Sequence, residues 1–269
     1  MSEFTFERGA ERGLLRVGVP AACRYFEGHF ADEPMLPAVA HFALADDVLG
    51  SGALDEPLHV AGVSSFRLRA AVRPGATLEL RCARIGDSER VRWRVRSAAR
   101  SVAEGVLIAA AGARRGKPPE PSSASNAAPL HAYLPQGGPA LFIGELLEGD
   151  AEDARAQAAV SSASAFVRAR DGARWFPSYL VVELGAQAAA AAEARQRRAL
   201  EGPSDAAPRA GYLVRASDVR YDEPELPADA PLVAHAVLSA AAPPLRTWET
   251  RLELDGRIVA SARVSTFAR

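Results

Sequence analysis

The sequence predicts an α+β fold made of two similar halves, each an antiparallel sheet packed against one long helix, fused as a pseudo-dimer. Three observations lead to this fold class. Apolar and charged residues alternate along several stretches, as they do in half-buried strands. Two other stretches carry apolar residues at helical spacing. A strand, a helix and four strands follow one another in the same order on both sides of a linker.

The first half is predicted to contain a strand at 14–19, then a loop, then a helix at 38–49 that ends near two glycines. Proline–glycine and glycine–aspartate turn signals separate the strands that follow. The clearest of them is 90–97, where Val91, Trp93 and Val95 alternate with arginines. The four strands after the helix are expected at 58–70, 77–85, 90–97 and 102–111.

Residues 113–129 are predicted to be a linker. They are rich in proline, serine and charge, a composition that cannot build a core. We therefore expect a first domain at 1–112 and a second domain at 130–269.

The second half repeats the order of elements. Strand-like runs at 140–147 and 154–161 lead to a loop at 170–172 and to a long helix from Pro177 to about Leu200. Asp255-Gly256 is a strong hairpin turn signal between two alternating stretches. The four strands after the helix are expected at 211–221, 231–239, 245–254 and 257–266.

His29 is the first candidate functional residue. Gly28 permits unusual backbone angles, and Pro34 and Pro37 restrict theirs, so this loop holds a side chain in one place. Histidine can exchange a proton near neutral pH. The residues alone leave an equally good alternative, which is a histidine whose ring is satisfied by backbone groups in a tight loop.

Glu183 is the second candidate. It lies in the predicted second helix among apolar neighbours, and Gln187 is four residues further on, so the two polar side chains share a helix face. A glutamate in these surroundings either is buried for a purpose or reaches solvent at the helix edge. The residues themselves do not decide between these two interpretations.

Two motifs resemble a known family. Gly28-His29-Phe30-x-x-x-Pro34-x-x-Pro37 resembles the active-site loop of the β-hydroxyacyl-acyl-carrier-protein dehydratases of the hotdog superfamily. It departs at Ala31, where the family has proline, and at Ala38, where it has glycine. The stretch from Pro177 to Glu183, Ala186 and Gln187 is similar to the helix that carries the acid of the same enzymes. There Ser178 replaces a glycine, and Gln136 lies where these enzymes have a Pro-His-Arg sequence.

The first half resembles one, and the second half the other, of the paired dehydratases of aryl polyene synthesis, so the chain is similar to a fusion of the two types. The resemblance implies a double hotdog with one composite site. The family's acid lies fourteen positions after its histidine, and here that position is Ala43. The matching loop of the second half, 168–170, has no histidine. Sites in this family take the histidine from one protomer and the acid from the other. His29 and Glu183 are therefore expected to form one catalytic pair, while Ala43 and the 168–170 loop form an inactive counterpart.

The implied reaction is the elimination of water from a 3-hydroxyacyl thioester, in fatty acid, polyketide or aryl polyene synthesis. His29 is expected to remove the proton next to the carbonyl and Glu183 to protonate the leaving hydroxyl. Backbone N–H groups near Ser178 are expected to polarise the carbonyl, and Gln187 to order the departing water. Gly28 and Phe30 complete the expected substrate contacts. Neither a metal nor another cofactor is implied.

The implied partner is an acyl carrier protein, with a ketosynthase and further copies of the chain as additional partners. Arginines 67, 69, 73, 81 and 84 are candidate carrier contacts, although a solvated strand face explains any one of them more simply. The net charge of -1 gives no reason to expect nucleic acid binding. The start lacks a signal peptide and no apolar run suits a membrane span, so we expect a cytoplasmic protein.

Two other functions remain open at this stage. A hotdog thioesterase would use Glu183 to activate water and would not need His29. A non-catalytic scaffold would bind the acyl chain without turnover, and the altered residues Ala31, Ala38 and Gln136 leave room for it.

Overall fold

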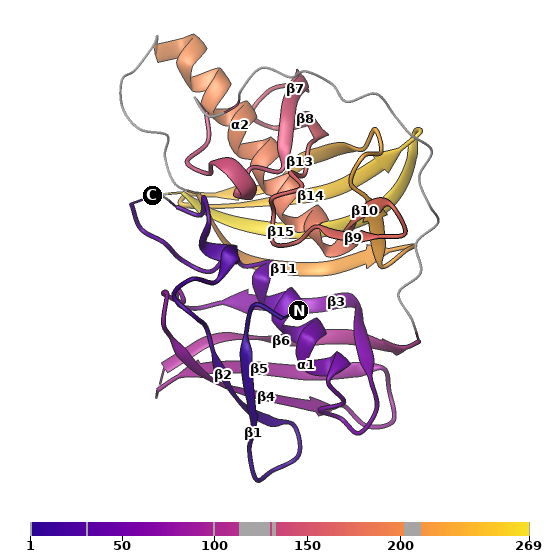
Figure 1. Cartoon of the computed structure of the whole chain (residues 1–269). Helices are drawn as coiled ribbons and strands as arrows, with labels where there is room; N and C mark the ends of the chain where they lie inside the picture. The colour runs from indigo at the N-terminus through magenta and orange to yellow at the C-terminus, as the bar shows by residue number, and fades with distance from the viewer. Residues whose placement is uncertain are drawn as a thin grey trace.

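The computed structural model describes residues 2–30, 32–98, 100–112, 130, 133–201 and 211–268. Its main feature is one antiparallel sheet of 12 strands, in the order β1-β2-β4-β5-β6-β3-β11-β15-β14-β13-β8-β7. The six strands of the first half form one side of this sheet (Figure 1). They are β1 (Thr5–Arg8), β2 (Leu14–Gly18), β3 (Leu58–Leu68), β4 (Thr77–Arg84), β5 (Arg90–Ser97) and β6 (Arg100–Ala111).

The second half supplies the other six strands. They are β7 (Ile143–Gly149), β8 (Asp153–Ala158), β11 (Gly211–Tyr221), β13 (Val233–Ala242), β14 (Leu245–Leu254) and β15 (Arg257–Ala268). The halves meet where β3 pairs antiparallel with β11, with Phe66 opposite Ala216. The side chain of Tyr221 also donates a hydrogen bond of 2.5 Å to the carbonyl of Val60 across this junction. The predicted fusion of two sheet-and-helix units is confirmed, and the two sheets are continuous.

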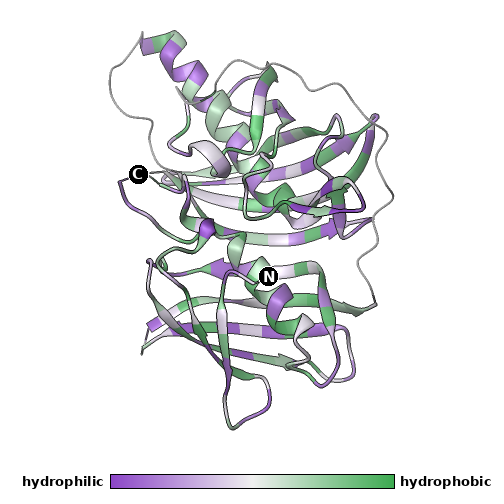
Figure 2. Ribbon diagram, viewed as in Figure 1, coloured by the Kyte–Doolittle hydropathy of each residue, from purple (hydrophilic) through white to green (hydrophobic). Residues whose placement is uncertain are grey.

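One helix lies in each half. In the first half α1 (Ala40–Gly50) packs on β3, and in the second half α2 (Val181–Glu201) packs on β7, β8, β11, β13, β14 and β15. Alanine-rich sequence favours helix formation and permits close packing. Gly185 shows how close this packing is, because a Cβ there would lie 2.4 Å from Thr250 on β14. Figure 2 shows the hydrophobic residues of both helices along the ribbon.

The cores of the two halves join between the helices. Phe42 of α1 lies edge-on to Tyr179, with ring centroids 5.7 Å apart, and Tyr179 belongs to the short helix η4 (Ser178–Leu180) before α2. Tyr25 of the first half lies 4.7 Å from Phe166 of the second. Arg24 donates a 2.8 Å hydrogen bond to the carbonyl of Ala163. These contacts hold the loop before α1 against the second half.

The predicted strands agree with the structure best where alternation is strict. The predicted bounds of β5, β11 and β14 are those observed. The helix expected from 38 begins instead at Ala40, after a turn. Strand β1 was not predicted, and neither was a small sheet in the order β12-β10-β9. Its strands are β9 (Arg168–Arg170), β10 (Ala173–Pro177) and β12 (Glu225–Pro227), and they are too short for a periodic pattern.

The predicted linker 113–129 lies outside the described residues, as does Ala31, so the domain boundaries stay a prediction. Cys23 and Cys82 are buried free thiols. Among the described residues, no helix is long and apolar enough to cross a membrane.

Candidate active site

The loop that carries His29 is held against the second half of the chain. Gly28 has φ +79°, and a Cβ there would lie 1.9 Å from the carbonyl oxygen of Gly137. The amide of Gly137 in turn donates a 3.1 Å hydrogen bond to the carbonyl of Gly28. Only glycine fits both this backbone conformation and this close approach. Gly28 therefore positions His29 rather than contacting the cavity described below.

The imidazole of His29 is oriented by one backbone carbonyl. Its Nδ1 lies 3.0 Å from the carbonyl oxygen of Met35, and the amide of Met35 donates back to the carbonyl of His29 at 3.0 Å. Because a carbonyl can only accept, Nδ1 carries the hydrogen in the neutral ring and Nε2 keeps a lone pair. The ring of Phe30 stacks on the imidazole at 4.3 Å. His29 is thus a buried base held in one tautomer.

Glu183 lies on the first turns of α2 and is buried. The amide nitrogen of Gln187 donates to its Oε1 at 3.1 Å, so the two side chains share a helix face as predicted. Gln187 also donates to the carbonyl of Ala140 and accepts from the amide of Phe142, both at 2.8 Å. Both of its N–H donors and its carbonyl oxygen therefore have partners. Gln187 positions Glu183 and the 140–142 segment, and its hydrogen bonds leave it little capacity to order a water molecule.

The two candidate residues meet at one cavity. His29 from the first half and Glu183 from the second both line a space of about 850 Å³ that opens to solvent. Both also border a smaller hollow of about 280 Å³ between Arg24, Phe142 and Phe166. The larger cavity is bounded mostly by apolar side chains, including Met35, Leu36, Leu213 and Trp248. An apolar cavity with few convergent polar groups is the usual form of a small-molecule site.

Ser178 does not line this cavity, which corrects the expectation that N–H groups beside it face the substrate. Its amide donates to the carbonyl of Pro224 at 3.0 Å, and its hydroxyl donates to the carbonyl of Glu223 at 2.5 Å. Both donors are thus already used. The corresponding turn of the first half behaves differently. Ala38 does line the cavity, and its amide has no hydrogen-bond acceptor among the described residues.

Phe30 and Gln136 also line the cavity. Phe30 meets Tyr212 edge-on, with ring centroids 6.0 Å apart. Gln136 is 8% exposed, and its Oε1 has no hydrogen-bond partner within the described part of the chain. A buried, unpaired carbonyl oxygen in a cavity wall is available to a ligand that donates a hydrogen bond.

The counterpart positions form a different arrangement, which we call the vacant site: Ala43, Asp47 and Arg168–Arg170. Ala43 is 1% exposed and offers no acid. The guanidinium of Arg168 lies 3.9 Å from Asp47 of α1, and Ser2 donates a 2.8 Å hydrogen bond to the same carboxylate. An ion pair and a contact from the N-terminal segment thus lie at these positions, beside an open hollow that the same residues border.

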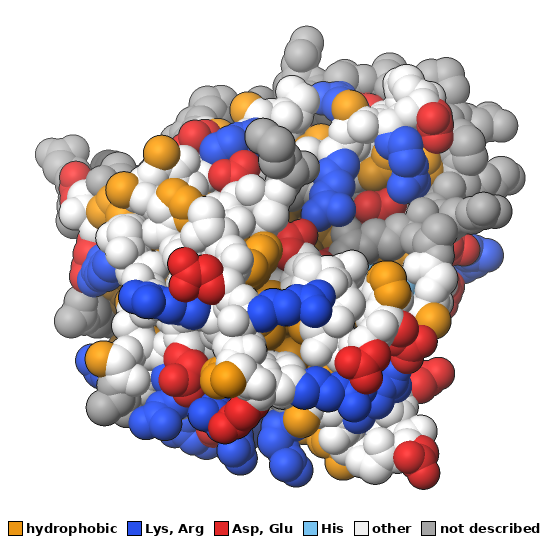
Figure 3. Space-filling view, turned by 60° about the horizontal axis from the view of Figure 1, so that its bottom comes forward, with side chains coloured by type: hydrophobic (Ala, Val, Ile, Leu, Met, Phe, Trp, Pro, Cys, Tyr) orange, Lys and Arg blue, Asp and Glu red, His pale blue; other side chains and the backbone are white. Residues whose placement is uncertain are grey.

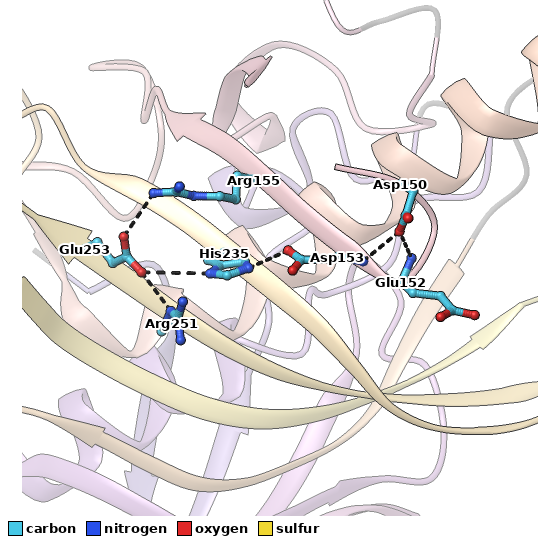
Figure 4. A network of polar contacts seen from close by, with 7 residues as sticks. All are labelled: Asp150, Glu152, Asp153, Arg155, His235, Arg251 and Glu253. Atoms are coloured by element: carbon cyan, nitrogen blue, oxygen red, sulfur yellow. Dashed lines mark hydrogen bonds and ion pairs between the residues drawn. The ribbon is translucent and has the colours of Figure 1, made fainter. Parts of the chain in front are cut away.

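A second cluster of charged groups lies apart from the cavity, on β8, β13 and β14 (Figure 4). His235 Nε2 lies 2.5 Å from Asp153, and its Nδ1 lies 3.8 Å from Glu253. Arg155 and Arg251 flank Glu253 at 3.1 and 2.7 Å. None of these residues belongs to the lining of the cavity. The cluster is an ion-pair network on the sheet.

The candidate carrier contacts of the first half are largely neutralised. Figure 3 turns this end of the molecule toward the viewer and shows arginine and acidic side chains next to one another. Four of the five predicted arginines have carboxylate partners: Arg69 with Glu104, Arg73 with Glu33, Arg81 with Glu11 and Glu79, and Arg84 with Glu56. A solvated, charge-balanced surface therefore explains most of this group.

Comparison with known proteins identifies the family. The family model of the ApeP-like dehydratases matches residues 128–269, which is more than half of the chain. The chain belongs to the ApeP-like dehydratases. The family model of the ApeI-like dehydratases matches residues 7–106. The predicted resemblance to a fusion of the two dehydratase types is confirmed.

A curated relative and two solved structures agree with this family. The 3-hydroxyacyl-[acyl-carrier-protein] dehydratase FabZ of Granulibacter bethesdensis is 29% identical over 109 residues, which cover 38% of this chain and 62% of the relative. The dehydratase domain of PpsC from Mycobacterium tuberculosis, solved with C12:1-CoA, has a TM-score of 0.61 at 19% identity, covering 98% of this chain and 97% of its own. A dehydratase from type I polyketide synthases has a TM-score of 0.60 at 16% identity, with the same coverage. The predicted double hotdog fold is confirmed.

Sequence reasoning missed several groups that line this ApeP-like site. Tyr212 and Trp248 come from strands far from either motif, and their alternation indicated only that they belong to strands. Ala38 was noticed because it replaces a family glycine, but its side chain offers no chemistry, so its backbone amide was overlooked. The carbonyl of Met35 gives no signal in the sequence, because any residue at that position supplies one.

Proposed function

We propose that this chain is a 3-hydroxyacyl-[acyl-carrier-protein] dehydratase that converts a 3-hydroxyacyl thioester into the 2-enoyl thioester in the cytoplasm. The observation that carries this proposal is the single cavity lined by His29 of one half and Glu183 of the other. One group is oriented as a base and the other is a buried carboxyl. Elimination of water needs this combination, because a proton leaves C2 while the hydroxyl on C3 must depart as water.

His29 is the proposed base. Its Nδ1–H points to the carbonyl of Met35, so Nε2 is the nitrogen free to accept the C2 proton. The same hydrogen bond stabilises the ring after protonation, because the imidazolium donates a stronger bond to that carbonyl. The electron pair released from the C2–H bond forms the new C2–C3 double bond as the C3–O bond breaks.

Glu183 is the proposed acid. The Gln187 amide donates to Oε1, so the acid proton resides on the other carboxyl oxygen. That proton joins the departing hydroxyl, which leaves as water, and the carboxylate is formed. Transfer of the C2 proton from His29 to Glu183 then restores both groups. Gln187 acts as a positioning residue for Glu183 in this scheme.

Ala38 is the proposed source of the N–H that polarises the thioester carbonyl. Its amide lies in the turn that leads into α1 and has no acceptor among the described residues, and Ala38 borders the cavity. An amide at the start of a helix also carries the positive end of the helix dipole. Negative charge that develops on the thioester oxygen during proton removal is stabilised by such a donor.

The proposed substrate is carried by an acyl carrier protein, as the name of the FabZ relative states for that enzyme. The match to the ApeI-like and ApeP-like families favours a substrate from polyketide or aryl polyene synthesis, besides fatty acid synthesis. We also propose that 1–112 and 130–269 are the two hotdog domains, each contributing one member of the catalytic pair. A ketosynthase partner and further oligomerisation stay predictions.

The test is mass spectrometry of a 3-hydroxyacyl carrier-protein thioester incubated with wild type, His29→Ala and Glu183→Gln. Wild type should remove one molecule of water, and each substitution should lower the rate by about 10²–10⁴-fold, the usual contribution of a positioned acid or base. His235→Gln and Glu249→Gln are the matched controls, since neither residue lines the cavity. Intact substrate with wild type contradicts the proposal. Release of the free acid indicates a thioesterase instead.

A further inference from the structure

One wall of the cavity carries an arginine on a strand face that is otherwise buried. Arg246 lies on β14, and alternation places it on the same side as Trp248 and Thr250, which are 1% and 2% exposed. This is the side that packs on α2. Arg246 pairs in register with Thr266 of β15, and Arg246, Trp248 and Thr266 all line the cavity.

Arg246 forms an ion pair with Glu193 of α2, which lines the same cavity. Their side chains are 37% and 26% exposed, so this part of the cavity opens to solvent. Burial raises the pKa of Glu193, and the positive charges of Arg246 and Arg197 oppose that rise. Arg197, four residues after Glu193 on α2, thus adds a second positive charge near this carboxylate.

The position of this pair relative to the reacting groups is set by α2. Glu183 and Glu193 are ten residues apart on the same helix, which corresponds to about 15 Å along its axis at 1.5 Å per residue. Between them the cavity is bordered by Ala186, Ala189 and Ala190. Small side chains leave an apolar channel along the helix, and it links the catalytic pair to the charged mouth.

We propose that Arg246, supported by Arg197, binds the phosphate at the end of the phosphopantetheine arm that presents the acyl thioester. This inference rests on the proposed function, because only a carrier-bound or coenzyme A-bound acyl group brings such an arm. The charged mouth opens to solvent, where the arm must enter, whereas the end of an acyl chain would be buried. The ion pair uses Nη1 of Arg246, and a guanidinium has five N–H donors, so further donors remain for a phosphate.

The experiment compares two small substrates that differ only by this phosphate: the 3-hydroxyacyl thioesters of 4′-phosphopantetheine and of pantetheine. Wild type should prefer the phosphorylated substrate in kcat/KM by about tenfold, the effect of one charge-assisted hydrogen bond at a partly exposed site. Arg246→Met should abolish most of this preference, and Arg197→Met should reduce it. Glu193→Gln should increase it, because that substitution removes the competing carboxylate.

The control is Arg263→Met, since Arg263 lies on β15, pairs with Glu249 and does not line the cavity. It should keep the wild-type preference. A structural role for the ion pair would instead make Arg246→Met and Glu193→Gln slow both substrates equally, and that result overturns the inference. Turnover of both substrates by wild type without any preference also overturns it. Absence of turnover with either substrate, and with the carrier-bound thioester, contradicts the proposed function instead.

The carrier-bound thioester identifies the source of the phosphate. If the carrier arm uses this site, Arg246→Met should slow the carrier-bound substrate by at least the factor seen with the phosphopantetheine thioester. A carrier-bound substrate that is slowed no more than the pantetheine thioester would place the carrier's phosphate elsewhere and overturn the inference.

Discussion

The chain has two counterpart interfaces, in each of which the loop before the helix of one half meets the helix of the other half. Equivalent positions carry different residues at the two interfaces. Aligning Pro37 with Pro177 pairs His29 with Ala169 and Ala43 with Glu183. At one interface, histidine and glutamate border an open, mostly apolar cavity. At the vacant site both of these positions are alanine.

The surroundings differ as much as the pair itself. The position that holds Gln187 at the cavity is Asp47 at the vacant site, and its carboxylate is bound by Ser2 and lies beside Arg168. Phe4 also stacks on Tyr25, with ring centroids 5.5 Å apart, so the N-terminal segment packs over this side. The comparison teaches that loss of the reacting groups is accompanied by new polar contacts at the equivalent positions, beside a hollow that stays open to solvent. A fused chain can thus keep one catalytic pair and lose the other.

The largest effect is expected from an attempt to restore the missing acid. Ala43→Glu places a carboxyl where the present side chain is 1% exposed and surrounded by apolar groups of α1 and the sheet. We expect a loss of about 3–5 kcal/mol in the free energy of unfolding, the usual cost of an unpaired buried charge. Urea unfolding measures it, with Leu200→Glu as a control at a position that is 79% exposed.

This prediction fails if Ala43→Glu is as stable as wild type. A stronger contradiction would come from a variant in which His29→Ala inactivates the existing site while Ala43→Glu and Ala169→His supply the missing pair at the vacant site. Dehydration by that variant would contradict the prediction. In that case the vacant site would have kept the shape of an active site.

A second difference between the helices predicts acid sensitivity. His41 of α1 is fully buried, and burial lowers its pKa from the ordinary 6.5 to about 4. Its counterpart on α2 is Val181, which carries no charge. As the pH falls below 6.5 the unfolded chain binds a proton that the native protein excludes, so stability is lost down to about pH 4. The loss over this window is about 3 kcal/mol, at about 1.4 kcal/mol per pH unit.

The substitution that removes this difference is His41→Val. Thermal or urea unfolding between pH 7 and pH 4 should then show a flatter decline than in wild type, by about 3 kcal/mol at the acid end. His59→Val is the matched control, since His59 is partly exposed on β3. Identical pH profiles for wild type and His41→Val would contradict the assignment of acid sensitivity to this residue.

These comparisons also show how much of the fold and of the candidate site can be predicted from the sequence. Strict alternation, as in Val91, Trp93 and Val95, predicted strand bounds, because one buried face requires period two. The His29 and Glu183 motifs, through their resemblance to the dehydratases, predicted that one residue from each half would border the same cavity. Backbone N–H groups near Ser178 were expected to face the substrate, whereas the helix-start residue that lines the cavity is Ala38. That choice depends on which helix start borders the cavity, and no local pattern encodes it.

The position of Arg246 at the cavity could not be predicted from the sequence, for a related reason. Within 245–254 alternation puts Arg246 in phase with Trp248, but a charged residue near the end of a strand gives no sign that it borders a cavity. The structure places it on the face shared with Trp248, at the partly open end of the strand. Only the packing of β14 on α2 brings Arg246 to Glu193.

The positioning of Glu183 gives the next prediction. Gln187→Leu removes its hydrogen bond to Glu183 and the bonds to the 140–142 segment. We expect kcat to fall by about 10²-fold with little change in KM, because small displacements of a catalytic group carry such a cost. Gln196→Leu is the matched control on the same helix, since Gln196 accepts a hydrogen bond from the amide of Ala151 and lies outside the cavity. A rise in KM with an unchanged kcat would mean that Gln187 binds substrate instead.

The smallest effect is expected at the ion pair of the vacant site. Arg168 is 51% exposed and Asp47 is 19% exposed, and their charged atoms are 3.9 Å apart, so solvent screens most of their attraction. Arg168→Met should therefore cost less than about 1 kcal/mol of stability and leave the dehydration rate unchanged. Asp47→Asn should cost somewhat more, because the carboxylate also accepts from Ser2. A change in turnover from either substitution would show that the two interfaces are coupled, and the vacant site would then regulate the active one rather than being an inactive counterpart.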